Sequence, residues 1–327
     1  MTFPLKKILN GGVAALVLFG GVGASAEEVR LKLGHVAQPS HPFHTGALKL
    51  AELAKQYSNG ELIVDVFPAS QIGNERDMIE GARLGTIDML LTSTAPVMGF
   101  ERRFGVLDMP FIFRDVQHAH KVLDGDIGKQ LFAALEKKGL KGLAWFENGF
   151  RNITNSKHEI KTDKDLNGLV IRTMENPIHI AYFKKLGAVP QPMAFGELYP
   201  ALEKKVVDGQ ENPIGAIVSG RFYEVQKYTS LTGHVYSGVP VLMSLKRFNG
   251  LSKTQQVALQ RAATEAAAFE RSQLASQDEE GLQLLRKNGV VVTTPDRTSF
   301  AAAAESIRDS FAEKTDPKLL RQIVETK

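Results

Sequence analysis

Short runs of apolar and β-branched residues alternate with longer stretches of helical periodicity along the first part of the chain. Runs of four to eight such residues between turn signals favour strands, and apolar positions spaced three and four apart favour helices. In order, the pattern predicts a strand over 29–33, a helix over 46–57, a strand over 62–67, a helix over 75–84 and a strand over 88–92. This alternation predicts an α/β fold with a largely parallel sheet.

The same rhythm restarts after Gly142, with runs at 144–146, 163–167, 170–172, 178–186 and 200–204, and 206–207 beyond them. The sequence therefore predicts two α/β units, one after the other. A chain of 327 residues is also long for a single core, which favours two lobes of roughly 150 residues each.

The longest helical signal begins at Ser252, which is placed to cap a helix with Gln255 at the reciprocal position of a capping box. It runs to Gly289, which suits the left-handed terminator, over about 36 residues or roughly 54 Å. A helix of that length either breaks near Gly281 or lies across both lobes. Residues 290–293 then predict a late strand and 298–312 a last helix.

The first 26 residues have the three parts of a secretory signal peptide. Lys6 and Lys7 precede an apolar, glycine-containing run over 8–22, and small residues follow up to Ala26. The alternative is a retained membrane anchor, but the run is short of the roughly 20 apolar residues that cross a bilayer. We expect cleavage after Ala26, a mature chain beginning at Glu27, and export to the periplasm.

The amino-acid composition excludes some classes of function. There is no cysteine, so neither disulfides nor thiolate chemistry is available. The formal charge is +4, and without the two signal-peptide lysines it is 4 − 2 = +2 for the mature chain. Both signs are spread along the sequence without a basic cluster, which argues against nucleic acid as a partner.

Two arginines stand at predicted strand ends. Arg151 follows a glycine turn after the strand at 144–146, and Arg172 ends the strand at 170–172. Ligands of open α/β folds bind where strands end, and the guanidinium fork matches a carboxylate bidentately. The two arginines are therefore candidates to meet across one pocket. The competing interpretation is that each pairs with an aspartate or glutamate on the surface.

Asn212 precedes a proline at the end of the run beginning at Val206, where it suits either a ligand carboxylate or an ordinary turn. His41 lies in a predicted strand-to-helix loop and is a candidate to face a ligand. No histidine spacing typical of a zinc site is present, so no metal is expected. His118 and His120 are interpreted as packing or solvent-facing residues.

Catalytic motifs are missing from the sequence. It has no nucleophile elbow, no phosphate-binding Gly-x-x-x-x-Gly-Lys-Ser/Thr loop and no dinucleotide fingerprint after a strand. The paired carboxylates Glu279 and Glu280 sit on the long charged helix, where a solvated face explains them. We therefore expect neither an enzyme nor a cofactor.

Six separated motifs, in order, resemble the DctP-type substrate-binding subunits of tripartite ATP-independent periplasmic (TRAP) transporters. The likeness runs from Leu31 to about Val292. The motifs are Gly73-Asn74-Glu75-Arg76, Leu107-Asp108-Met109-Pro110-Phe111, Asn148-Gly149-Phe150-Arg151, Gly168-Leu169-Val170-Ile171-Arg172, Pro192-Met193-Ala194-Phe195, and Asp208-Gly209-Gln210-Glu211-Asn212-Pro213 with the segment 222–228.

The resemblance implies a two-lobed α/β fold of the periplasmic-binding-protein type, type II-like, with hinge strands and the long helix spanning both lobes. With the signal peptide at 1–26, lobe I would comprise 27–149 plus about 236–276, and lobe II 150–235 plus about 277–327. It also implies delivery of the ligand to TRAP membrane permease subunits, without bound ATP, by a chain expected to be a monomer.

The resemblance also implies roles for individual residues. Arg172 would clamp the carboxylate of a small organic acid, with Arg151 and Asn212 as its supporting partners. Phe195 would wall the pocket, and Glu75 from the other lobe would reach hydroxyl or amine groups at the far end of the ligand. Tyr236 and His41 are candidates for specificity.

The polar set at the far end favours a sugar acid, either a hexuronate or an aldonate. It consists of Glu75, His41, Ser93, Thr94 and Tyr236. A C4-dicarboxylate is the second candidate, and it would need a further cation such as protonated His41 or His35. Two other classes stay open: a periplasmic sugar-acid enzyme using Glu75 and a histidine, and a sensor module.

Overall fold

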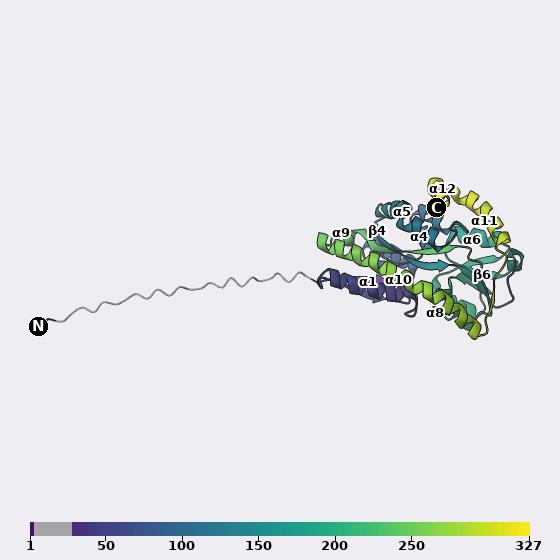
Figure 1. Ribbon diagram of the computed structural model, residues 1–327, viewed down its shortest axis with the longest axis horizontal. Helices are drawn as coiled ribbons and strands as arrows, with labels where there is room; N and C mark the ends of the chain where they lie inside the picture. Colours follow the sequence, from purple (N-terminus) through teal and green to yellow (C-terminus); the bar gives the residue numbers. More distant parts are fainter. Residues whose placement is uncertain (3–27) are drawn as a thin grey trace.

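A computed structural model describes residues 1–2 and 28–327. The predicted signal peptide and its cleavage site after Ala26 lie outside the described residues. Figure 1 shows two α/β halves lying end to end, with one long helix running along both. Within the described part of the chain, no helix is long and apolar enough to cross a membrane.

The first half is built on a five-stranded mixed sheet. Strands β1, β2 and β3 are parallel, as the alternating pattern predicts, but β10 runs antiparallel between β3 and β4. The order across the sheet is β2 (Leu62–Phe67), β1 (Val29–Gly34), β3 (Met89–Leu91), β10 (Tyr236–Ser244) and β4 (Leu140–Phe150).

The second half is built on a six-stranded sheet that is also mixed. Strand β5 is antiparallel to both of its neighbours, whereas β6 is parallel to β7 and β8. The order is β11 (Val291–Thr293), β9 (Tyr228–Ser230), β5 (Asn152–Asn155), β8 (Gly209–Asn212), β6 (Val170–Thr173) and β7 (Val189–Pro192).

Helices surround both sheets. Those in the sequence of the first half are α1 (Pro42–Tyr57), α2 (Glu75–Leu84), α3 (Thr94–Val97), the 3-10 helix η1 (Arg102–Asp108), α4 (Val116–Asp124), α5 (Asp126–Glu136) and α9 (Leu245–Asn249). Those of the second half are η2 (Asp163–Leu166), α6 (Pro177–Lys185), α7 (Phe195–Glu203), α8 (Ile214–Ser219) and η3 (Phe222–Glu224). The chain ends with α11 (Arg297–Ala312) and α12 (Pro317–Glu325).

The long helix α10 (Lys253–Lys287) is unbroken and braces both halves, so the predicted span is confirmed and a break near Gly281 is not found. Its start has the predicted capping box between Ser252 and Gln255. It packs along α1 and β4 in the first half and against α8 and β11 in the second (Figure 1).

Besides α10, two short segments carry the chain between the sheets. Strand β4 passes through Arg151 directly into β5, and residues 231–235 return the chain from β9 to β10. Backbone hydrogen bonds join the two segments: the Arg151 N–H donates to Val235 O at 2.8 Å, and the His234 N–H donates to Arg151 O at 3.2 Å. These segments are the hinge strands that the fold requires.

Two local predictions are corrected. The strand expected at 144–146 does not end in a glycine turn, because β4 continues through Gly149, whose φ of 96° falls beside an irregularity in the pairing with β10. The strand expected at 206–207 forms three residues later as β8, where it gains hydrogen-bonding partners on both sides from β5 and β6.

The predicted lobe boundaries, 27–149 with 236–276 and 150–235 with 277–327, remain a proposal. Helix α11 packs on α6 of the second half, but α12 packs on α5 of the first. His118 Nε2 lies 2.9 Å from Ile323 O, and Leu319 and Ile323 are buried in α12. The last helix therefore lies against helices of the first half.

Candidate ligand-binding site

A narrow cavity lies between the two halves, and the empty volume around its lining atoms, open solvent included, is about 400 Å³. Six of the seven predicted site residues line it together: Arg172, Arg151, Asn212, Glu75, Phe195 and His41. The other lining residues are Val36, Ala37, Phe43, Ser93, Asn148, Met174, Ala216 and Ser219. Both halves therefore contribute to a single site.

Arg172 in β6 has an unused hydrogen-bond donor at this cavity. Its Nε and Nη2 donate to Met193 O at 3.0 and 2.7 Å, which fixes the guanidinium plane. Its Nη1 is buried and has no hydrogen-bond partner among the described residues. Burial lowers the pKa of Arg172 to about 10, so the group remains a cation at neutral pH.

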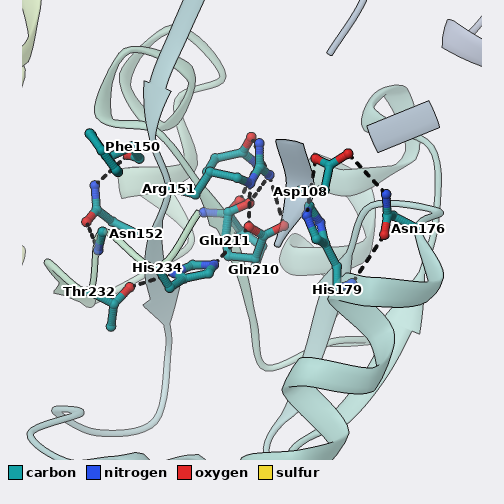
Figure 2. Close-up of polar contacts among 12 residues, drawn as sticks. Asp108, Phe150, Arg151, Asn152, Asn176, His179, Gln210, Glu211, Thr232 and His234 are labelled. Atoms are coloured by element: carbon teal, nitrogen blue, oxygen red, sulfur yellow. Dashed lines mark hydrogen bonds and ion pairs between the residues drawn. The ribbon is translucent and has the colours of Figure 1, made fainter. Parts of the chain in front are cut away.

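Arg151, by contrast, is held in a buried ion pair with Glu211 (Figure 2). Its Nε donates to one carboxylate oxygen of Glu211, and Nη2 donates to the other oxygen at 2.9 Å and to Asn212 Oδ1 at 3.1 Å. His234 Nε2 lies 3.3 Å from the same carboxylate. Burial alone would raise the pKa of Glu211, but Arg151 and His234 outweigh it and hold that pKa well below its usual value.

The competing interpretation of the two arginines is thus true of one of them. Arg151 pairs with an acidic residue, although the pair is buried and beside the hinge rather than on the surface. Arg172 makes no such pair among the described residues and retains an open donor. The sequence has no signal that separates them, because both follow apolar strands.

Glu75 enters the cavity from the opposite half as the first residue of α2. The helix start is fixed by a capping box between Asn74 and Asp77. One carboxylate oxygen, Oε1, accepts from the Thr92 hydroxyl at 3.0 Å and from the Ser93 N–H and hydroxyl at 2.9 and 2.7 Å. None of these bonds uses Oε2, which leaves an acceptor for a ligand.

His41 lies at the start of α1, also in the first half. Its Nδ1 accepts from the Phe43 N–H at 3.1 Å and so caps the helix. The side chain is 1% exposed. Burial, with a smaller contribution from His35, lowers the pKa of His41 to about 3, so its imidazole is neutral at neutral pH.

Phe195 forms part of the apolar wall with Met174 and Phe43, and its ring packs against Phe222 at 5.8 Å between centroids. Tyr236 is not among the cavity-lining residues. It begins β10, is 2% exposed, and meets Phe113 and Phe150 edge to face. Asn148, Met174 and Ser219 were not singled out from the sequence, although Asn148 belongs to the quoted motif that contains Arg151.

No group of three or more metal-ligating side chains occurs in residues 1–2 and 28–327. The polar groups at the cavity include the free Nη1 donor of Arg172, the fixed carboxylate of Glu75, the neutral imidazole of His41, and Asn148 Oδ1, a buried acceptor without a partner among the described residues. Such a set binds a small organic anion by a charge-assisted hydrogen bond at one end and by neutral hydrogen bonds elsewhere. Two α/β halves enclosing such a cavity beside a hinge define a two-lobed solute-binding protein.

The chain belongs to the family described as bacterial extracellular solute-binding protein, family 7 (DctP), which matches residues 33–315. It is 42% identical over 301 residues to the 2,3-diketo-L-gulonate-binding periplasmic protein YiaO of Escherichia coli, covering 91% of each chain. It is 35% identical over 317 residues to the C4-dicarboxylate-binding periplasmic protein DctP of Rhodobacter capsulatus, covering 94% of this chain and 95% of that one.

A solved structure supports the same assignment. The TRAP periplasmic solute-binding protein of Polaromonas sp. JS666, bound to D-erythronate, superposes with a TM-score of 0.90 at 39% identity, covering 92% of this chain and 99% of that one. The chain is therefore a TRAP-type solute-binding protein for organic acids. Members of this family are periplasmic transport proteins and not enzymes.

Proposed function

We propose that this protein captures a hydroxylated monocarboxylate, a sugar acid of the hexuronate or aldonate type, and delivers it to TRAP membrane permease subunits. The observation that carries the proposal is Arg172 Nη1, a buried charged donor that has no partner among the described residues and lies at the cavity between the two halves. An unsatisfied buried donor is costly, and a carboxylate oxygen satisfies it with a charge-assisted bond.

The charges around the cavity favour one carboxylate over two. Arg151 is already balanced by Glu211, so Arg172 is the cation left for the ligand. Burial lowers the pKa of Arg172, and the negative charges of Glu211 and, to a smaller extent, Glu75 act against this lowering, so Glu75 and Arg172 share one electrostatic field. A second ligand carboxylate near Glu75 would meet like charge, whereas a hydroxyl would donate to Glu75.

A C4-dicarboxylate is the second candidate because the relative from Rhodobacter capsulatus binds that class. It would require another cation at the far end of the cavity. Burial lowers the pKa of both His35 and His41 to about 3, so neither supplies that charge at neutral pH. The ligands of YiaO and of the Polaromonas protein, an oxidised sugar acid and an aldonate, support the first candidate.

Closure follows from the distribution of the site. Glu75 and His41 belong to the first half, whereas Arg172, Arg151 and Asn212 belong to the second. A ligand that contacts both sets binds the closed arrangement more tightly than the open one and shifts the population toward it. We propose that the permease recognises this closed form, and that the exported chain begins at Glu27, acts as a monomer and releases its ligand unchanged.

The test is a thermal-shift screen of the chain from Glu27 against hexuronates, aldonates and C4-dicarboxylates. A ligand at 100 times its Kd should stabilise the fold by about 2.7 kcal/mol. We expect a shift with sugar acids that disappears in Arg172→Ala and persists in Arg321→Ala, a control at an exposed position on α12. A shift with dicarboxylates alone would favour the second candidate, and a shift that survives Arg172→Ala would contradict the proposed clamp.

A further inference from the structure

Besides Arg172 Nη1 and Asn148 Oδ1, a third buried polar atom at the cavity lacks a partner among the described residues. His41 Nε2 is buried and makes no hydrogen bond to any described residue, although the ring lines the same cavity as Arg172 and Glu75. It lies close to the opposite half, since a β-carbon added at Gly215 of α8 would be 3.4 Å from it. The absence of a side chain at Gly215 leaves space beside the imidazole.

The hydrogen-bonding character of this atom is set by the other ring nitrogen. The Phe43 N–H donates to His41 Nδ1 at 3.1 Å, so Nδ1 is the unprotonated acceptor. A neutral imidazole with an unprotonated Nδ1 carries its proton on Nε2. His41 therefore presents an N–H donor, and no positive charge, to the cavity.

The ring is also held in position. His41 has extended backbone angles, φ −84° and ψ 146°, at the N-cap of α1, and Pro42 fixes the first helical residue. Its ring packs edge to face against Phe43, with centroids 4.4 Å apart. A donor that is fixed before the ligand arrives discriminates well, because little conformational freedom is lost on binding.

We infer that His41 is a specificity-determining residue whose Nε2–H donates to a hydroxyl or keto oxygen on the carbon chain of the ligand. The inference rests on the proposed function and deepens it. Arg172 binds the carboxylate, Glu75 accepts from a hydroxyl, and His41 selects for an oxygen acceptor away from the carboxylate. An analogue that lacks this oxygen leaves a buried donor unsatisfied, which costs roughly 5- to 150-fold in affinity.

The experiment combines a substitution at His41 with removal of single hydroxyl groups from the ligand. His41→Asn retains a good N-cap, because the asparagine Oδ1 accepts from the Phe43 N–H, but it has no atom at the place of Nε2. Calorimetric titration compares wild type and variant with D-gluconate, D-galactonate and their monodeoxy analogues. We expect wild type to bind one of the monodeoxy analogues about 5- to 150-fold more weakly than the parent acid. The variant should bind that analogue with a Kd within about threefold of its Kd for the parent acid.

His44→Asn is the matched control, since His44 is a half-buried histidine of the same helix that does not line the cavity. It should keep the wild-type discrimination. Equal weakening of every ligand by His41→Asn would mean that the residue only supports the fold or the closure, and unchanged discrimination would mean that water satisfies Nε2. Either result overturns this inference alone, whereas wild type that binds only C4-dicarboxylates overturns the proposed function with it.

Discussion

At the residue scale, the site is defined by polar atoms that the protein leaves without partners. Arg151 and Arg172 are both buried cations beside one cavity, but the first is neutralised by Glu211 and the second is not. Burying an unpaired charge is unfavourable unless another group compensates it. The ligand carboxylate is the group that completes the balance, which explains why Arg172 rather than Arg151 is the expected anchor.

The buried histidines predict how stability depends on pH. Burial lowers the pKa of His35 and His41 from 6.5 to about 3, so protonation favours the unfolded chain. Their contribution is complete above the unfolded pKa of 6.5 and is lost as the pH falls from 6.5 towards 3. Each should make the free energy of unfolding fall by roughly 1.4 kcal/mol per pH unit in that window.

Urea denaturation between pH 4 and 8 measures this slope. His41→Asn should reduce the slope by about the contribution of one buried histidine. His158→Asn, at an exposed position, serves as the control. An unchanged slope in His41→Asn would show that His41 is not the buried neutral group described here.

Six of the seven site residues predicted from the sequence line the cavity, and Tyr236 does not. The family motifs brought Arg172, Arg151, Asn212, Glu75 and Phe195 to one cavity, and the loop position did the same for His41. Tyr236 is different because every residue of β10 is buried. A strand buried on both faces has no polar alternation, so its sequence does not reveal which side chains face a cavity.

At the element scale, the sequence predicted those elements whose start and end are determined by neighbouring residues. The capping box and glycine terminator located α10, whose start and end depend on neighbouring residues. Strand β8, Gly-Gln-Glu-Asn, has little intrinsic strand preference and forms because β5 and β6 pair with it on both sides. Helix α12 was missed, and the predicted last helix, α11, is followed by one more.

Because α10 lies close to α8, replacing a glycine of α10 by alanine should change stability in the direction opposite to the one that helix propensity predicts. In an exposed helix, glycine to alanine stabilises by roughly 0.5–1 kcal/mol. At Gly281, however, a β-carbon would lie 2.6 Å from Ile214 Cγ2, a buried β-branched side chain with little freedom to move. Gly281→Ala should therefore lower the free energy of unfolding, by about 1–3 kcal/mol for an overpacked contact.

Chemical denaturation measures this change. Ala275→Gly, at an exposed position of the same helix, measures the difference in helix propensity between alanine and glycine without a packing contact. Ile214→Ala in the Gly281→Ala background should recover part of the loss by removing the clashing methyl group. Stabilisation by Gly281→Ala alone would show that α8 moves aside at no cost and that the two helices are not tightly packed.

At the scale of the whole molecule, a buried polar contact joins the halves away from the cavity. Asn176 at the start of α6 donates to Ala95 O at 3.2 Å and to Asp108 Oδ2 at 3.4 Å. Asp108 also accepts from Thr94 at 3.0 Å, and His179 lies 3.5 Å from it (Figure 2). None of these five residues lines the cavity, so the contact favours closure without recognising the ligand.

This separation predicts a change in affinity without a change in specificity. Asn176→Asp keeps the helix cap but places a second carboxylate beside Asp108, which disfavours the closed arrangement. When the closed state is the minority in the free protein, the apparent Kd rises in proportion to the lost population. A lost buried bond of 1–3 kcal/mol corresponds to a rise of roughly 5- to 150-fold, equal for every ligand.

The double variant Asp108→Asn with Asn176→Asp exchanges the amide and the carboxylate and should restore part of the affinity, since the amide at 108 can donate to the carboxylate at 176, although no donor then faces Ala95 O. Titration with several acids measures Kd, and small-angle scattering with and without ligand reports closure. Weakening that differs from one acid to another would place these residues in recognition. Failure of the double variant to recover would mean that the single change acts through the fold and not through the balance between open and closed states.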